Sequence, residues 1–202
     1  MDQGSKGADH PVELLLEDVI SIPEDQPHEE TPSPGQLARP ADPGAITTLE
    51  LQLAEARHRK QVSDLAVRIA ACYARATALF VVNDETIAGL SAEGEGLAER
   101  IEGVLISTEC EGLFRAPLST GQAHRQAPSA SADDVRLMRA LGRSEACDVL
   151  IVPVAVRGRT VNLIYADNGP DRLAETAVGA LVTLGSFLTK VYEGLISAPP
   201  PA

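Results

Sequence analysis

The chain has 202 residues and a mass of 21.3 kDa, enough for one domain of ordinary size and a tail. Its formal net charge of −12 argues against a general binder of nucleic acid or anionic membranes, because a negative surface repels phosphate groups. No apolar run approaches the roughly 20 residues that a membrane span needs, so we expect no membrane insertion.

The chain shows no secretory signal, because its N-terminus has no basic segment followed by an apolar one. The three cysteines, Cys72, Cys110 and Cys147, lie far apart and form no C-x-x-C pair. This spacing argues against a zinc site or a disulfide framework. We therefore expect a cytoplasmic protein with reduced thiols and with no metal or other cofactor.

The first 45 residues differ in composition from the rest of the chain. They hold ten acidic and two basic residues, seven of the 14 prolines and no aromatic residue. Such a segment has too little apolar surface to offset the entropy of ordering. We predict a disordered acidic arm over 1–45, a domain over 46–196 and a disordered tail over 197–202.

One apolar cluster interrupts this arm between Pro11 and Pro23. An acidic–apolar stretch of this kind is a candidate linear motif that docks in the groove of a protein partner. It can also be a passive tail, or it can fold back on its own domain. The candidate partner-binding residues are Leu14, Leu15, Leu16, Val19 and Ile20.

The first half of the domain alternates between helix and strand signals. Apolar residues spaced by three and four predict one helix over 46–76, with the basic stretch 57–61 as a solvated face. The elements expected after it are strands over 78–82 and 86–90, a helical turn over 97–101, a short strand over 104–106 and a helix over 108–119 that ends at Gly121.

The stretch over 122–130 is polar and is predicted to be irregular. Ser131 follows it as the cap of a helix with an acid at its third position, Asp134, in the manner of a capping box. Val135 is among the apolar residues of this helix, and Gly142 ends it.

The clearest signal is a hairpin formed by 148–156 and 159–166. The first segment is apolar on both faces, as in a covered strand, and Arg157-Gly158 is a tight two-residue turn. Pro153 cannot donate a ladder hydrogen bond, so we expect it at a bulge or on a free edge. A final helix is predicted over about 171–195.

This order of elements resembles a GAF-type sensory domain. The run 150–161 is similar to the GAF pattern of an apolar strand with a proline, a turn with glycine and a return strand. The segment 114–121 resembles the mid-domain helix that ends in Thr-Gly in that family. The run 163–170 resembles the divergent GAF-like modules of myxobacterial regulatory and pilus- or secretion-associated proteins. Asn162 stands where many GAF domains have glycine in the return strand.

The resemblance implies an α+β fold with a roughly antiparallel sheet and long N- and C-terminal helices. It also implies a ligand pocket on one sheet face in many members, and frequent dimerisation. Two ligand signatures of the family are absent here. No lysine is preceded by asparagine, as in the cyclic-nucleotide signature, and no cysteine is followed by histidine, as in bilin attachment.

Basic residues near the middle of the domain are candidates for an anion pocket, because arginine binds such groups with two parallel hydrogen bonds. The candidate ligand-binding residues are Arg115, His124, Arg125 and Arg139. The competing interpretation is a set of solvated charges, since Arg136, Arg139 and Arg143 also fit an exposed helix face.

The final helix has two apolar sets, of which one can cover the sheet and the other can meet a second helix. The set with alternating spacings of four and three is the candidate seam of a homodimer, together with the first helix. The alternative is that both helices pack only on their own sheet. The seam candidates are Leu181, Leu184, Leu188 and Val191, and the second set is Val178, Val182 and Phe187.

An enzyme is not expected, because no histidine has a nucleophile or an orienting partner in a local motif, and acidic neighbours disfavour the Cys110 thiolate. The leading hypothesis is a non-catalytic adaptor that regulates bacterial signalling or cell-surface machinery through protein–protein contact. The alternative is a sensor of a nucleotide or an acidic metabolite, with its pocket between the sheet and residues 108–143.

Overall fold

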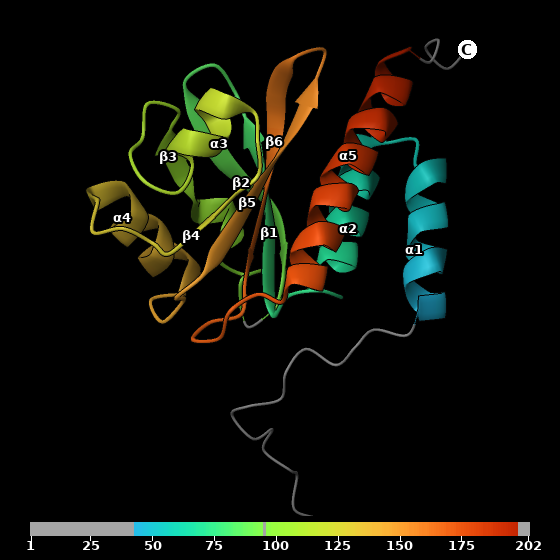
Figure 1. The fold of residues 1–202 in the computed structure, drawn as a ribbon. Helices are drawn as coiled ribbons and strands as arrows, with labels where there is room; N and C mark the ends of the chain where they lie inside the picture. Colours follow the sequence, from blue (N-terminus) through green and yellow to red (C-terminus); the bar gives the residue numbers. More distant parts are fainter. Residues whose placement is uncertain (1–42, 95, 198–202) are drawn as a thin grey trace, which may run out of the picture. The chain divides into compact units, whose positions relative to one another are not determined.

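The computed structural model describes residues 43–94 and 96–197. A six-stranded sheet lies between a layer of long helices and a layer of shorter helices and loops (Figure 1). The predicted arm, with its candidate docking residues, lies outside the described residues. Its expected end at residue 45 is three residues too late, because Pro43 already begins the first helix, where its fixed φ angle suits a first helical position.

The sheet is antiparallel throughout, in the order β3-β2-β1-β6-β5-β4, so the predicted α+β fold with an antiparallel sheet is confirmed. The strands are β1 (Ala76–Val82), β2 (Thr86–Glu93), β3 (Leu105–Ser107), β4 (His124–Gln126), β5 (Val149–Val156) and β6 (Arg159–Asp167).

The predicted hairpin is formed by β5 and β6. Arg157 and Gly158 both have positive φ angles, of 52° and 80°, as a tight two-residue hairpin turn requires. Pro153 pairs with Leu163 on the β6 side. On the other side, β4 pairs with β5 at Val149–Ile151, and the described strands leave the edge free at Pro153, as expected.

Two long helices cover one face of the sheet, with α5 over β5 and α2 over β1 and β2. The helix α1 packs against α2, outside this layer (Figure 1). Gly185 lets α5 lie close to the sheet, because an added Cβ would lie 2.6 Å from Val152 Cγ1. The helices are α1 (Pro43–Glu55), α2 (Arg59–Ala70), α3 (Arg115–Thr120), α4 (Ala132–Leu141) and α5 (Glu175–Ser197), with a 3₁₀ turn at Ile101–Gly103.

The prediction of one helix over 46–76 is wrong, because the chain turns at residues 56–58. His58 has extended backbone angles, and Ala56 is buried at the turn. A continuous helix of that length would run for about 45 Å, well beyond strands of about 25 Å. The turn lets Leu53 of α1 and Val62 of α2 enter the same core. The basic stretch 57–61 is exposed as expected, but it spans the end of this turn and the first three residues of α2.

Three other predicted elements need correction. The helix over 108–119 is shorter, because the chain forms turns up to Phe114 and Gly112 has a φ angle of 92°. The stretch predicted to be irregular contains the edge strand β4, which pairs through its backbone and carries no apolar alternation. The final helix begins at Glu175 and ends at Ser197, after an isolated bridge between Asn168 and Asp171.

The cap of α4 is as predicted at Ser131, whose hydroxyl accepts from the Asp134 amide. The reciprocal half of the capping box is absent among the described contacts. The Asp134 carboxylate instead accepts hydrogen bonds from the amides of Leu113 (2.8 Å) and Ser129 (2.7 Å). It thus holds the loop before α3 against α4. Val135, one of the apolar residues of this helix, is 45% exposed.

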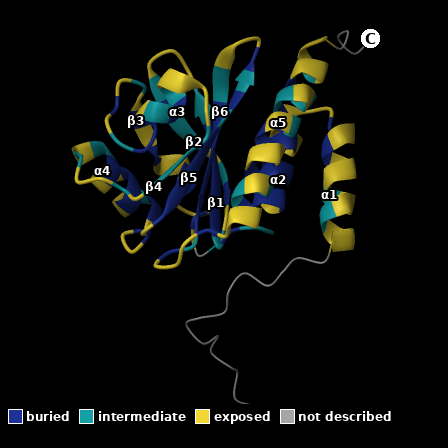
Figure 2. Ribbon diagram, in the orientation of Figure 1, coloured by how far each residue is buried: buried dark blue, intermediate teal, exposed yellow. Residues whose placement is uncertain are grey.

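Two hydrophobic cores lie on the two faces of the sheet (Figure 2). One core joins the sheet to α1, α2 and α5. The other joins the sheet to the segments on its opposite face, where the rings of Phe80 and Phe114 meet edge to face with centroids 5.2 Å apart. Tyr165 and Ile151 belong to this second core and are fully buried.

Candidate interaction groove

The four candidate ligand-binding residues do not form one pocket. Arg125 forms ion pairs with Asp148 (2.8 Å) and Glu175 (2.5 Å), and it donates to the Leu173 carbonyl. It therefore ties β4 to the start of α5. His124 lies within hydrogen-bond distance of Thr120 Oγ1, at 3.2 Å.

The other two candidates, Arg115 on α3 and Arg139 on α4, are exposed. Arg139 lines a shallow surface cavity beside Asp134, whose carboxylate disfavours an anion there. Of the three arginines expected on an exposed helix face, only Arg136 and Arg139 are exposed. Arg143 is buried and forms an ion pair with Asp167, so its inclusion in that face is wrong.

Core side chains fill much of the space where a sensor pocket was expected, between the sheet and residues 108–143, and a cavity of about 490 Å³ lined by Met138 and Arg139 remains there. Phe80 of β1 contacts Phe114, and the Tyr165 hydroxyl of β6 lies 4.0 Å from the Met138 sulfur of α4. These four residues are at most 6% exposed. A ligand placed among these four residues would have to displace well-packed apolar side chains.

The cysteines occupy three different environments. Burial raises the pKa of the Cys110 thiol to about 11, and the nearby carboxylates of Asp133 and Asp134 add to this effect. Burial also raises the pKa of Cys72. Cys147 is exposed, and its thiol donates to the Pro170 carbonyl at 3.0 Å. Within residues 43–94 and 96–197, no three histidine, cysteine or acidic residues are placed to hold a metal ion.

The candidate dimer seam packs on the chain's own sheet. Leu181, Leu184 and Leu188 are at most 5% exposed and belong to the core between α5, α2 and the sheet. Val191 is half-buried at the edge of that core. The alternating spacing therefore marks the side of α5 that faces the sheet, and these leucines are not available as a surface seam.

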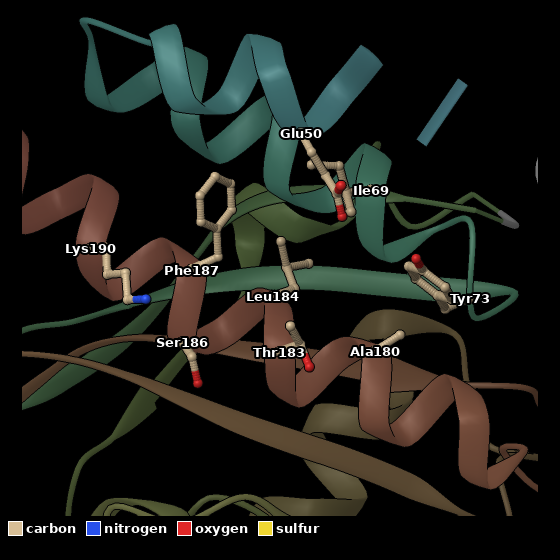
Figure 3. Close-up of a pocket in the computed structure, with 9 residues that line it drawn as sticks. All are labelled: Glu50, Ile69, Tyr73, Ala180, Thr183, Leu184, Ser186, Phe187 and Lys190. Atoms are coloured by element: carbon tan, nitrogen blue, oxygen red, sulfur yellow. The ribbon is translucent and has the colours of Figure 1, made fainter. Parts of the chain in front are cut away.

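An apolar groove runs along α5 between α1 and α2. Figure 3 shows Phe187 on α5, with its ring directed toward the α1 side, and Tyr73 at the other end. The first part of the groove has a volume of about 490 Å³. It is lined by Glu50, Ile69, Tyr73, Ala180, Thr183, Leu184, Ser186, Phe187 and Lys190.

The groove continues toward the C-terminal end of α5, because Phe187 and Lys190 also line a second cavity of about 370 Å³. Its other lining residues are Ala54, Ala56, Arg57, Val191, Gly194 and Leu195. Together these two cavities define what we call the α1–α5 groove.

The α1–α5 groove combines an apolar floor with a polar rim. Ile69, Leu184 and Phe187 form the floor, and Glu50 and Lys190 place opposite charges on the rim. Burial raises the pKa of Tyr73, and the Glu50 carboxylate adds to this rise. Such a surface suits the apolar face of an amphipathic helix. The sequence signal for it was the second apolar set of the final helix, which includes Phe187.

Comparisons with solved structures place the fold among GAF domains. The GAF domain of a phosphoenolpyruvate-protein phosphotransferase from Coxiella burnetii has a TM-score of 0.62 at 18% identity, and the match covers 76% of this chain and 94% of that one. A methyl-accepting chemotaxis protein, residues 122 to 287, has a TM-score of 0.61 at 16% identity, over 75% of this chain and 99% of that one.

A third similar structure is an enzyme, the free methionine-R-sulfoxide reductase from Neisseria meningitidis, with a TM-score of 0.59 at 15% identity, over 76% of this chain and 89% of that one. No protein-family model matches the sequence, and no curated protein matches it. None of the described helices is both long and apolar enough to cross a membrane. At these identities the likeness concerns the fold, and this chain has a GAF-like fold.

Proposed function

We propose that this chain is a non-catalytic regulatory module that acts through protein–protein contact. The observation that carries the proposal is a contrast between the two faces of the sheet. On the face expected to hold a small ligand, core side chains such as Phe80 and Tyr165 are closely packed against the sheet. The helical layer on the other face carries an open apolar groove with Phe187 half-buried in it.

The first partner in this proposal is a second copy of the chain, bound through the α1–α5 groove. A two-fold interface must be complementary to itself. The rim of the groove meets this condition, because Glu50 of one copy can face Lys190 of the other. The apolar residues Leu51 and Val182, which are 62% and 38% exposed, lie on the same two helices and would gain cover.

The wider setting of the proposal is bacterial signalling or the control of cell-surface machinery, in the cytoplasm. The likeness to a chemotaxis protein and to a phosphotransferase GAF domain supports a signalling role. The run 163–170 supports a place among the divergent GAF-like modules of myxobacterial regulatory proteins. The acidic–apolar cluster, Leu14 to Ile20, is a second candidate contact for a protein partner.

Light scattering tests the homodimer with a pair of matched variants. Phe187→Glu places a negative charge in the α1–α5 groove. Val135→Glu places the same charge at an exposed position of α4, on the other side of the sheet. We expect a dimer at tens of micromolar for the natural chain and for Val135→Glu, and a folded monomer for Phe187→Glu. Circular dichroism checks that each variant is folded.

A monomeric natural chain, or a Phe187→Glu variant that stays dimeric, would contradict self-association through this groove. Contact with another protein is tested separately by a photo-crosslinking residue at position 187 or 135, introduced in cells that express the chain. The proposal expects one defined adduct from position 187 and none from position 135. Equal adducts from both positions would contradict a role for the groove.

A further inference from the structure

We propose that a further cavity, distinct from the two cavities of the α1–α5 groove, binds a free fatty acid through its carboxylate and its apolar chain. It lies at the end of the sheet where α2 begins and α5 ends. The cavity has a volume of about 520 Å³ and lies on the α2–α5 side of the sheet, away from residues 108–143. It is lined by Arg59, Ser63, Val81, Val82, Asn83, Leu90, Val156, Arg159, Val161, Asn162, Tyr192, Leu195 and Ile196.

The cavity lies between distant parts of the chain. The turn before α2, the last turn of α5 and the tip of the β5–β6 hairpin all reach this end of the sheet (Figure 1). Asn162 is 4% exposed and donates from its side-chain amide to the Phe80 carbonyl at 2.9 Å. This bond fixes Asn162 in the wall of the cavity, where a glycine would leave additional space.

Most of the lining is aliphatic, which favours an apolar ligand chain. Val156 and Val161 belong to the hairpin, and Leu195 and Ile196 belong to the end of α5. Ile196 is 44% exposed, so a bound chain would remove apolar surface from water. The volume falls within the range of about 300–1,000 Å³ that is typical of small-molecule sites.

The charged end of the ligand is assigned to Arg59. This residue opens α2, and no ion pair of Arg59 occurs among the residues that the structure describes. The N-terminus of α2 adds positive potential, and His58 gives it no side-chain cap. A guanidinium binds a carboxylate through two parallel hydrogen bonds.

The other cationic group of the cavity is already paired. Arg159 lies 2.5 Å from Asp84 at the rim, and both side chains are well exposed. Two polar residues, Ser63 and the buried Tyr192, also line the cavity, and the Ser63 hydroxyl donates to the Arg59 carbonyl. Among the residues that the structure describes, the site thus offers one guanidinium without an ion pair, two hydroxyl groups and aliphatic walls. This arrangement fits a single anionic head better than a polyanion.

Nuclear magnetic resonance titration of the full chain with octanoate tests the proposal. We expect saturable shifts of backbone amides around the cavity, in α2, the β5–β6 hairpin and the end of α5. Octanol and acetate, which each lack one half of the proposed chemistry, are expected to bind at least tenfold more weakly. Shifts confined to the α1–α5 groove, or binding of octanol as tight as that of octanoate, would contradict the assignment.

Variants separate the head from the chain. Arg59→Gln is expected to weaken octanoate binding at least tenfold, whereas Arg68→Gln, an exposed change further along α2, should leave it unchanged. Ile196→Glu should weaken binding as well, because it puts a negative charge where the chain lies. Unchanged affinity in both Arg59→Gln and Ile196→Glu would overturn the site. Neither Arg59 nor Ile196 lines the α1–α5 groove. Loss of octanoate binding in these variants can therefore be distinguished from loss of the homodimer.

Discussion

Arg143 and Asp167 form an ion pair that is buried almost completely. The Arg143 Nη2 atom lies 2.6 Å from Asp167 Oδ1, and the two side chains are 2% and 0% exposed. The Tyr165 hydroxyl and the Gly169 amide also donate to this carboxylate, at 2.7 and 2.6 Å. Arg143 follows the glycine that ends α4, so the pair anchors α4 to the end of β6.

Removal of one partner of this pair is expected to cost much of the stability of the domain. Arg143→Leu would leave the Asp167 carboxylate buried without its counter-ion, which typically costs about 3–5 kcal/mol. Urea unfolding measures the change, and Arg139→Leu, on the exposed face of α4, is the control with a small expected effect. An equal decrease in the free energy of unfolding in both variants would show that the buried ion pair contributes no more to stability than an exposed arginine.

The hydrogen bonds of Asp148 make part of the stability depend on pH. Burial by itself raises the pKa of Asp148, but hydrogen bonds from Arg125 and from the Leu173 amide outweigh it and lower the pKa below its ordinary value. The stabilisation is therefore complete above the pKa of the unfolded chain, about 3.9, and is lost as the pH falls through the lower folded value.

Asp148→Asn should reveal this dependence. We expect the difference in unfolding free energy between the natural chain and Asp148→Asn to be constant from pH 7 to about pH 5, and to shrink below about pH 4. Denaturant titrations at several pH values measure it. A difference that grows on acidification would mean that the Asp148 carboxyl is stabilised in its neutral form.

The three thiols should react with iodoacetamide in a fixed order. Cys147 is exposed, whereas burial raises the pKa of Cys72 and raises that of Cys110 to about 11. Because the thiolate is the reactive form, at pH 8 we expect Cys147 to be alkylated first and Cys110 last. Peptide mass spectrometry over a time course measures the order, and the unfolded chain is the control. Early alkylation of Cys110 would argue against its burial.

The turn between β5 and β6 offers a stabilising substitution. Arg157 has a φ angle of 52°, which most side chains with a Cβ adopt at a cost, and asparagine tolerates it better. Arg157→Asn should therefore raise the unfolding free energy by about 0.5–1 kcal/mol. Gly158→Ala, at a φ angle of 80°, should lower it. Thermal unfolding of both variants decides whether the turn has this geometry.

Local sequence signals were sufficient for several elements. The Arg157-Gly158 turn, the Ser131 cap and the ends of helices at Gly121 and Gly142 were predicted correctly. Each depends on the φ angle or the hydrogen bond of a residue and its close neighbours in the chain, so the information lies within a few positions. The resemblance to a GAF domain was drawn from the order of these elements along the chain and from the apolar hairpin.

Other features depend on contacts between distant residues. The break between α1 and α2 exists because both helices reach one core, and no helix-breaking residue marks it. The strand β4 is defined by its pairing with β5. In the sequence, Arg125 and Arg143 resemble solvated charges. In the structure, Arg125 binds the carboxylate of Asp148 and Arg143 binds that of Asp167, each more than twenty positions away.

The amino-acid pattern alone was enough to predict an apolar core, the antiparallel hairpin of β5 and β6 and the long C-terminal helix α5. Which apolar stripe of α5 meets the sheet followed from the packing of the whole domain and not from the pattern of α5. Leu181, Leu184 and Leu188 are buried in the chain's own core, and Phe187 is left in the α1–α5 groove. Both stripes have helical spacing and similar hydrophobicity, so the choice between them depends on how α2 and the sheet pack against the helix.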